Sequence, residues 1–265
     1  MTIRITLLGT GTSTGVPIIG CHCDTCTSHD PRDRRDRPGA MVQFTGPAGD
    51  KQTVLIDTST DLRWQMIRHD VMSIAGIVYT HNHADHIFGL DDVRRFNAMQ
   101  PGAIDIFAEQ TVVSWIQRSF SYMFDSEVNV NNSFVPRLEL NTVEPGEGVT
   151  IAGRAFEPIR LLHGVLPILG WRVGNFAYCT DCSEIPEESM ERLEGLDVLV
   201  IDALRHRPHP THLSIEQALA VVEQLKPRRT YFTHIAHDIL HAELEATLPA
   251  GVQLGYDGLT IDMPE

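Results

Sequence analysis

The chain has 265 residues, of which 42% are hydrophobic and 21% charged, and its net charge at pH 7 is −14. This composition is that of a globular domain rather than a disordered or fibrous chain, and α/β domains reach this length as one unit. We therefore predict a single domain over residues 1–265. The acidic balance repels polyanions and argues against nucleic acid as a partner.

No apolar run reaches the ~20 residues that a membrane-spanning helix needs. The N-terminal residues alternate like a strand and lack the longer apolar core of a signal peptide. We therefore expect a cytoplasmic protein with no membrane association.

Hydrophobic periodicity predicts the following elements in chain order. In the first half, strands are expected at Ile3–Leu8, Met41–Phe44, Thr53–Ile56, Ile74–Tyr79 and Asp105–Ala108. Helices are expected there at Asp61–Asp70, Asp92–Met99 and Gln110–Met123. The segment Arg32–Arg37, in which arginines alternate with aspartates, is interpreted as a solvated loop.

The second half repeats this organisation. Its predicted strands are Val149–Ile151, Ala155–Leu161, Gly170–Val173, Phe176–Cys179, Val198–Ile201 and Thr230–Thr233. Its predicted helices are Pro186–Leu193, Ser214–Leu225 with Ser214 as N-cap, and Glu243–Leu248. Two strand-rich blocks, each followed by helices, predict a sandwich of two sheets with helices outside, of the α/β class.

Acidic and histidine side chains recur shortly after the predicted strands, where they can project from one edge of a rigid sheet. They are Asp57, His81, His163, Asp181 and His234. Within His81–His86, His81 and His83 can reach one ion, whereas Asp85 and His86 can reach a second. One ion could not use all these donors at ordinary coordination numbers. We therefore predict two divalent ions, for which Zn and Mn both suit the ligands.

The segment Thr80–His86 is similar to the His-x-His-x-Asp-His signature of the metallo-β-lactamase superfamily, and the other candidate ligands follow in the superfamily's order. The resemblance implies an αββα four-layer sandwich with a dinuclear metal site. It implies a first metal on His81, His83 and His163. It implies a second metal on Asp85, His86 and His234, with Asp181 as the bridge between the two. Asp57 would orient a ligand from outside through a hydrogen bond.

Three of the five cysteines crowd into Cys21–Cys26. This pattern is typical of metal binding in a reducing compartment rather than of a disulfide framework. Structural zinc commonly takes three cysteines and one histidine. We therefore predict a structural zinc on Cys21, Cys23 and Cys26, with His237 as the fourth ligand and His22 as the alternative.

Motifs near the start of the chain indicate a particular family within this superfamily. Gly15-Val16-Pro17, followed by Gly20-Cys21-His22-Cys23 and Cys26, resembles the cyclic phosphodiesterase family of the carbon–phosphorus lyase pathway of phosphonate degradation. The segments Thr233–His237 and Gly255–Gly258 are also similar to that family. The resemblance implies hydrolysis of phosphoribosyl 1,2-cyclic phosphate, a structural zinc and a homodimer.

His206, His209 and His212 precede the helix that Ser214 caps, and none is needed as a ligand. In the resembling family a histidine at the start of this helix assists catalysis, and His212 is the matching position. The hypothesis is that a hydroxide activated by the two metals attacks phosphorus while His212, as general acid, protonates the leaving oxygen. Asp85, as a ligand of the second metal, is counted with His212 among the catalytic residues.

Two alternative functions share parts of this pattern. A ribonuclease of the tRNA 3′-processing type has the same metal motif, but the net charge of −14 opposes it. A non-hydrolytic accessory protein of quinone cofactor biosynthesis has the same cysteine start, but the hydrolytic ligand set is complete here. We therefore favour the small-molecule phosphodiesterase.

Overall fold

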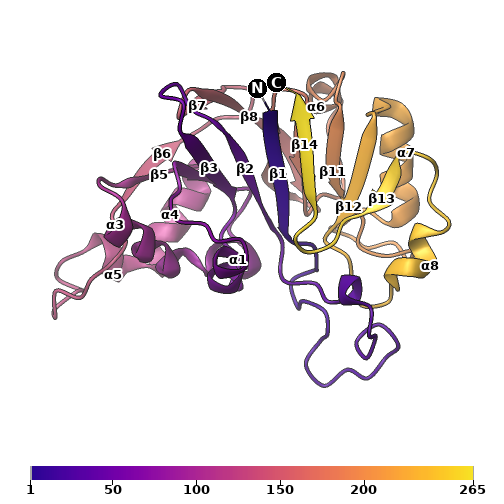
Figure 1. The fold of residues 1–265 in the computed structure, drawn as a ribbon, viewed down its shortest axis with the longest axis horizontal. Coiled ribbons are helices and arrows are strands. Elements are labelled where there is room, and N and C mark those ends of the chain that lie inside the picture. Colours follow the sequence, from indigo (N-terminus) through magenta and orange to yellow (C-terminus); the bar gives the residue numbers. More distant parts are fainter. Residues whose placement is uncertain (1, 265) are drawn as a thin grey trace.

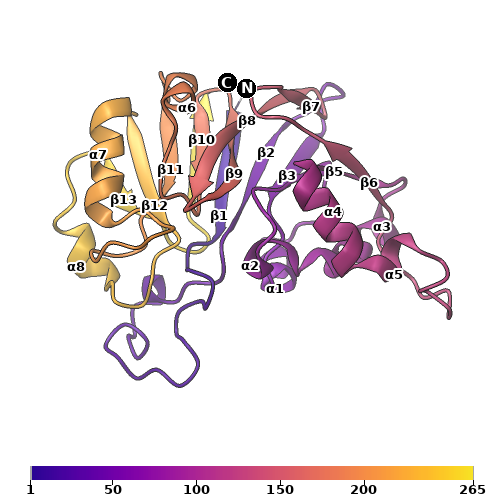
Figure 2. The same cartoon turned by 180° about the vertical axis from the view of Figure 1, so that it is seen from behind.

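The computed structural model describes residues 2–264, in which two seven-stranded β-sheets pack face to face with helices on their outer sides (Figures 1 and 2). The order in the first sheet is β14 (Thr260–Pro264), β1 (Thr2–Gly9), β2 (Gly39–Thr45), β3 (Lys51–Ile56), β4 (Gly76–Val78), β5 (Ile104–Ala108) and β6 (Leu138–Thr142). The order in the second is β13 (Val252–Leu254), β12 (Arg229–Thr233), β11 (Val198–Asp202), β10 (Phe176–Cys179), β9 (Leu166–Val173), β8 (Arg154–His163) and β7 (Val149–Ile151).

The helices connect strands within each sheet. Those of the first half are α1 (Leu62–Arg68), α2 (Ala84–Ile87), α3 (Arg94–Met99), α4 (Gln110–Ser119) and α5 (Ser121–Phe124). Those of the second half are α6 (Glu187–Arg192), α7 (Ile215–Leu225) and α8 (His241–Glu245). The two-sheet α/β sandwich with outer helices that the sequence predicted is confirmed. No helix among residues 2–264 is long and apolar enough to cross a membrane.

The parallel strands of both sheets end at the same side of the molecule. Strands β3 to β6 pair in parallel in the first sheet, and β10 to β13 do so in the second. Because parallel strands end at one edge, the loops that follow them gather there, at the lower side in Figure 1. The edge where β1 begins and β14 ends lies opposite, at the top.

Three apolar clusters hold the layers together. The central one lies between the sheets and includes Ile5, Val42, Trp171 and Tyr178, all fully buried. The other two lie under the outer helices, one on each sheet. The strand ends that carry the candidate ligands are therefore fixed between packed layers on both sides.

Several sequence predictions differ from the fold in detail. The helix expected at Gln110–Met123 is split into α4 and α5, because Phe120 leaves the helical region with φ −115° and ψ 38°. Strand β6 was not predicted, because its Leu-Glu-Leu-Asn-Thr sequence is short and only half-buried. The N-cap at Ser214 is confirmed, and it forms a capping box with Gln217.

The interpretation of Arg32–Arg37 as a solvated loop is wrong. The Arg35 side chain is 0% exposed and pairs with Asp33 at 3.1 Å. Its guanidinium also donates to the carbonyl oxygens of Ala236, at 2.9 Å, and Ile239, at 2.8 Å. Sequence alternation could not reveal this, since the partners lie about two hundred residues away. The pair connects the N-terminal loop to the segment after His234.

We predict that Asp33→Ala lowers the free energy of unfolding by about 3–5 kcal/mol, because it leaves a buried guanidinium without its counter-charge. Urea denaturation followed by circular dichroism measures this change. Asp262→Ala is the matched control, since it removes the partner of Arg4 in an exposed pair and should leave the unfolding midpoint nearly unchanged. Equal, small shifts for both variants would contradict the structural role given to the buried pair.

Candidate metal centre

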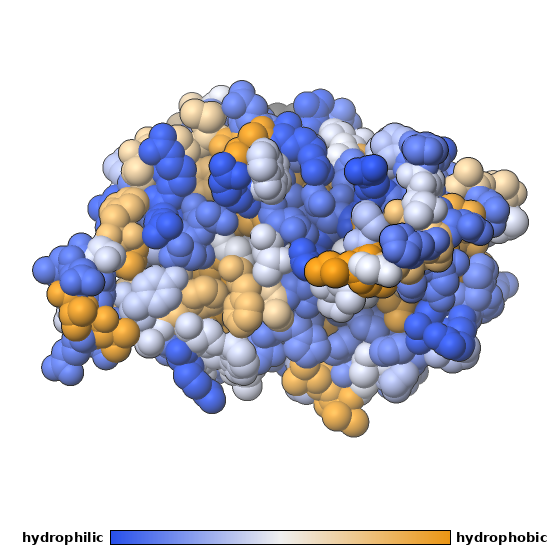
Figure 3. All heavy atoms as spheres, turned by 90° about the horizontal axis from the view of Figure 1, so that it is seen from below, coloured by the Kyte–Doolittle hydropathy of each residue, from blue (hydrophilic) through white to orange (hydrophobic). Residues whose placement is uncertain are grey.

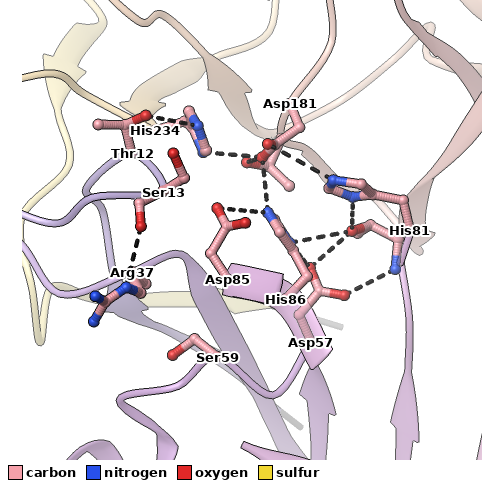
Figure 4. Close-up of polar contacts among 12 residues, drawn as sticks. Thr12, Ser13, Arg37, Asp57, Ser59, His81, Asp85, His86, Asp181 and His234 are labelled. Carbon is pink, nitrogen blue, oxygen red and sulfur yellow. Dashed lines mark hydrogen bonds and ion pairs between the residues drawn. The ribbon is translucent and has the colours of Figure 1, made fainter. Parts of the chain in front are cut away.

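Seven candidate ligands meet at the edge where the parallel strands end. Asp181 follows β10, His234 follows β12, and His163 is the last residue of β8. His81 follows β4 in the other sheet, while His83 is the N-cap of α2, which carries Asp85 and His86. Residues far apart in sequence therefore face each other across the two sheets, as Figure 4 shows for five of them.

Among residues 2–264, the seven candidate ligands fall into two groups in which all ligand atoms lie within 4.8 Å of one another, and a further such group joins His163 and Asp181 to His212. The first group comprises His81, His83 and His163. The second comprises Asp85, His86, Asp181 and His234. The first group has the members that the resemblance implies for one metal, and the second has those it implies for the other metal together with Asp181, whose Oδ2 faces His81 of the first group.

The position of Asp181 follows from three distances. One carboxylate oxygen, Oδ2, lies 3.9 Å from His81 Nε2. The other, Oδ1, lies 3.3 Å from His86 Nε2 and 2.9 Å from His234 Nδ1. One oxygen is thus directed to each group, which is the geometry that a bridging carboxylate requires.

The donor atoms fit divalent metals. Four of the inward-facing atoms are buried and have no hydrogen-bond partner in the described chain: His81 Nε2, Asp85 Oδ2, His86 Nε2 and His234 Nδ1. Buried polar atoms are nearly always satisfied, so a group of unsatisfied ones facing one another is best explained by an ion. Imidazole and carboxylate donors together suit zinc and manganese.

In each buried histidine of the two groups, the ring nitrogen that faces away from the ligand atoms forms a hydrogen bond to a residue outside the groups. His86 Nδ1 donates to Asp57 Oδ2 at 2.7 Å, and His163 Nδ1 donates to the Thr211 carbonyl oxygen at 2.7 Å. Since these oxygens only accept, the proton is on Nδ1 and Nε2 is left free for a metal. Asp57, predicted to act from outside the ligand set, also accepts from the amide of Thr80, at 2.8 Å.

Hydroxyl groups complete this outer layer and were missed by the sequence analysis. Thr80 Oγ1 lies 3.0 Å from His81 Nδ1, and Thr12 Oγ1 lies 3.1 Å from His234 Nε2. The contact between Thr12 and His234 appears in Figure 4. Threonine is too common for its type alone to indicate this role. The only signal was its position, next to a ligand or in the Gly-Thr-Gly-Thr loop.

Three residues of the site have left-handed backbone conformations. Asp57, Asp181 and His234 have φ of 65°, 58° and 59°, although none is glycine. Such a conformation costs about 1–3 kcal/mol and persists where the surroundings impose it, often at functional sites. Each of these residues follows a strand, so the sharp turn of the backbone directs its side chain into the centre instead of along the sheet.

The charges of the site are strongly coupled. Burial disfavours a charged imidazole, yet the carboxylates of Asp181, Asp85 and Asp57 together raise the pKa of His86 well above its usual value. Burial instead lowers the pKa of His81 well below its usual value. Three carboxylates in so small a buried volume need positive charge nearby, which two divalent ions would supply.

His212 lies against both groups. Its ring stacks on His234 with 4.6 Å between centroids and meets His163 edge-on at 4.7 Å. Its Nδ1 donates to Asp202 Oδ2 at 2.7 Å, which leaves Nε2 free. Burial lowers the pKa of His212. Asp202, the last residue of β11, was not assigned a role from sequence.

The cysteine group lies apart from these two. Cys21, Cys23 and Cys26 have their sulfur atoms 3.3, 3.4 and 3.6 Å from His237 Nδ1. This four-ligand set is the one predicted with His237, and His22 is not part of it. Cys182, whose role the sequence left open, is fully buried under the outer helices.

Hydrophilic residues cover most of the face seen from below, and the strongly hydrophobic ones form small separate groups on it (Figure 3). This is the face to which the loops after the parallel strands belong.

Comparisons with known proteins agree with this architecture. The family described as "Beta-lactamase superfamily domain" matches residues 52–235. A solved structure of a new diphosphatase of the PhnP family is 45% identical, has a TM-score of 0.91, and the match covers 99% of this chain and 98% of that one. The structure of Zn²⁺-bound PqqB from Methylobacterium extorquens shares the fold, with 18% identity, a TM-score of 0.76, and coverage of 98% and 100%.

A curated relative, octanoyltransferase of Porphyromonas gingivalis, is 38% identical over 97% of this chain, which spans only 51% of that protein. The name octanoyltransferase describes the whole of that relative, whereas the match covers only about half of its length. The superfamily match over residues 52–235 and the 45% identity along nearly all of a PhnP-family structure decide the classification. The chain belongs to the β-lactamase superfamily of metal-dependent hydrolases and, within it, to the PhnP family.

Proposed function

We propose that the chain is a metal-dependent phosphodiesterase that hydrolyses a small cyclic phosphodiester such as phosphoribosyl 1,2-cyclic phosphate. The observation that carries this proposal is the pair of ligand groups joined by Asp181, with the unliganded nitrogen of His212 beside both. The likeness to a structure described as a PhnP-family diphosphatase supports phosphorus chemistry. The acidic chain, at −14, supports a small substrate over nucleic acid.

In this proposal, His81, His83 and His163 hold the first metal, and Asp85, His86 and His234 hold the second. Asp181 would contribute Oδ2 on the side of the first group and Oδ1 on the side of the second. When bound there, two divalent ions would neutralise phosphoryl oxygens and make a water molecule a stronger nucleophile near neutral pH. Either Zn or Mn fits the donors.

The chain's own residues would then orient the substrate and move a proton. Asp202 holds the His212 ring in one orientation through Nδ1. The His212 ring lies beside the rings of His163 and His234, where its Nε2, once protonated, would donate that proton to the leaving oxygen. Proton donation by a positioned imidazole contributes about 10²–10⁴-fold to such a reaction.

We also propose that Cys21, Cys23, Cys26 and His237 hold a structural zinc. The four ligands form a closed set, as structural sites do. His237 follows His234 by three residues, and the buried pair of Arg35 and Asp33 is fastened to the same segment. A zinc here would therefore fix the segment that carries a ligand of the second metal.

We predict that the purified protein contains about three metal ions per chain, one of which resists chelation as a closed site should. Dialysis against EDTA should remove the other two and abolish hydrolysis of bis(p-nitrophenyl) phosphate, and added Mn²⁺ or Zn²⁺ should restore it. Metal content is measured by plasma mass spectrometry alongside the assay. Full activity of protein that retains only one ion would refute the dinuclear proposal.

We predict that His212→Ala lowers kcat by about 10²–10⁴-fold for a substrate with a sugar leaving oxygen. The loss should be much smaller for bis(p-nitrophenyl) phosphate, because p-nitrophenolate leaves without a proton. Asp202→Asn should show the same leaving-group dependence with a smaller loss. Equal losses on both substrates would show that His212 does not act as the proton donor, and unchanged metal content serves as the control for folding.

We predict that His237→Ala removes the chelation-resistant ion and lowers the thermal unfolding midpoint, because structural zinc contributes directly to folding. His22→Ala is the matched control from the same cysteine segment and should keep that ion. Retention of the ion by His237→Ala together with its loss from His22→Ala would identify His22 as the fourth ligand instead.

A further inference from the structure

The loop that follows β1 lies against the segment that carries His234. The amide of Ile235 donates to the Thr10 carbonyl oxygen at 2.8 Å, and the amide of Thr12 donates to the Ile235 carbonyl oxygen at 3.3 Å. Gly11 forms a parallel bridge with Ile235 between these two hydrogen bonds. The loop and the segment therefore run side by side, and a shift of the loop moves Thr12 relative to His234.

Thr12 is the residue of this loop that reaches the metal centre. His234 Nδ1 lies 2.9 Å from Asp181 Oδ1, on the side of the ligand atoms. When Nδ1 binds a metal, Nε2 carries the ring proton and donates it to Thr12 Oγ1, 3.1 Å away (Figure 4). A hydrogen bond of this kind fixes the orientation of a metal-binding imidazole and tunes its affinity for the ion.

Asp257 fastens the start of the same loop. This residue lies between β13 and β14, near the end of the chain. Its Oδ1 accepts from the amide and from the hydroxyl of Thr10, both at 2.9 Å. Its Oδ2 accepts from the amide of Asp36 at 2.6 Å. One carboxylate thus ties the loop to the segment around Asp36, and it does so two residues before Thr12.

The arrangement requires two acceptor oxygens at position 257. Asparagine has nearly the shape of aspartate but only one side-chain oxygen, so its amide group would face one of the donors. The surroundings leave little room for adjustment, because Thr10 is fully buried and a Cβ at Gly11 would lie 2.7 Å from the Arg35 carbonyl oxygen. The loss of one acceptor must therefore be taken up by a movement of the loop.

The far end of the loop is held independently. Arg37 Nε donates to the Ser13 carbonyl oxygen at 3.1 Å, a contact that Figure 4 shows beside the ligands. The guanidinium is itself held by Asp61, at 3.0 Å. Thr12 therefore lies between two fastened residues, Thr10 and Ser13, and its position follows from theirs.

We propose that Asp257 is a positioning residue for the second metal: through Thr10 it holds the loop where Thr12 orients His234. This inference rests on the proposed dinuclear centre and adds a residue outside its ligand set. It makes the affinity for one of the two ions depend on a segment near the chain end. The first metal does not depend on it, because its histidines are held by other residues, such as Thr211 for His163.

The test titrates the metal-free centre with Co²⁺, whose absorption bands report the ligands around each ion. His83→Ala and Asp85→Ala each remove a ligand of one group and so assign the bands. The pH is kept above the pKa of Asp257, which burial raises to about 7, so that the wild-type carboxylate is ionised. We expect Asp257→Asn to weaken binding of the second ion by about 10- to 100-fold and to leave that of the first unchanged. Thr10→Val, which removes one donor to the carboxylate, should give a smaller loss in the same direction.

A double variant tests whether Asp257 acts through Thr12. Thr12→Val alone should weaken binding of the second ion by about 10- to 100-fold. If both residues act on one path, Asp257→Asn with Thr12→Val should lose little more than Thr12→Val does, whereas independent effects would multiply. Asp262→Asn is the matched control, since it alters an exposed carboxylate of the same chain end, paired with Arg4, and should bind both ions as wild type does.

The possible failures are distinguishable. Equal weakening of both ions in Asp257→Asn would indicate a general loosening of the fold and would overturn the positioning role. Multiplied losses in the double variant, or wild-type affinity for both ions in Asp257→Asn, would overturn it as well. A wild-type protein that binds fewer than two Co²⁺ besides the chelation-resistant ion would instead refute the dinuclear centre, and the positioning role with it.

Discussion

The carboxylate of Asp181 lies between two groups of ligand atoms, and the surrounding structure is built to hold it there. Its two oxygens are directed to His81 on one side and to His86 and His234 on the other. A buried carboxylate is costly unless it is paired and hydrogen-bonded. Both sheets meet this requirement jointly, because the first provides His81 and His86 and the second provides Asp181 and His234.

Backbone strain is part of the same arrangement. The left-handed conformations of Asp57, Asp181 and His234 are unfavourable one by one, yet each turns a side chain out of its strand and into the centre. The packed layers on both sides of the strands stabilise these turns. The backbone of the site is therefore held by the packed core on both sides of the strands. The hydroxyls of Thr12 and Thr80 then fix the ring orientations of His234 and His81, which the backbone leaves free.

A second connection joins the N-terminal loop to the centre. The guanidinium of Arg35 holds the carbonyls of Ala236 and Ile239, and His237 lies among the three cysteine sulfurs. The segment that follows β12 thus begins with a ligand of one group and continues into a ligand of another. Contacts from Arg35 and the three cysteines therefore anchor the N-terminal loop, which has few strands or helices, to the segment that carries His234.

Predictions from sequence succeeded where chemistry is concentrated locally. The run His81–His86 and the cysteines of Cys21–Cys26 each place several ligand types within six residues, and such clusters are rare without a metal. The paired strands of the sandwich were also predictable, since burial between layers imposes continuous apolar runs. The end of helix α4 was not predictable, because the helix breaks at Phe120, where the sequence has neither a proline nor a glycine to mark it.

The amino-acid sequence by itself determined the fold class, the identity of the candidate metal ligands and the cysteine cluster. It did so because periodicity, strand-end position and ligand spacing are local properties of the chain. Only the tertiary structure decided that Asp202 holds His212, that Thr12 and Thr80 orient ligand rings, and that Arg35 is buried. It alone brought His209 beside His212. These contacts join segments whose distance in space is set by how the two sheets pack, which no local pattern encodes.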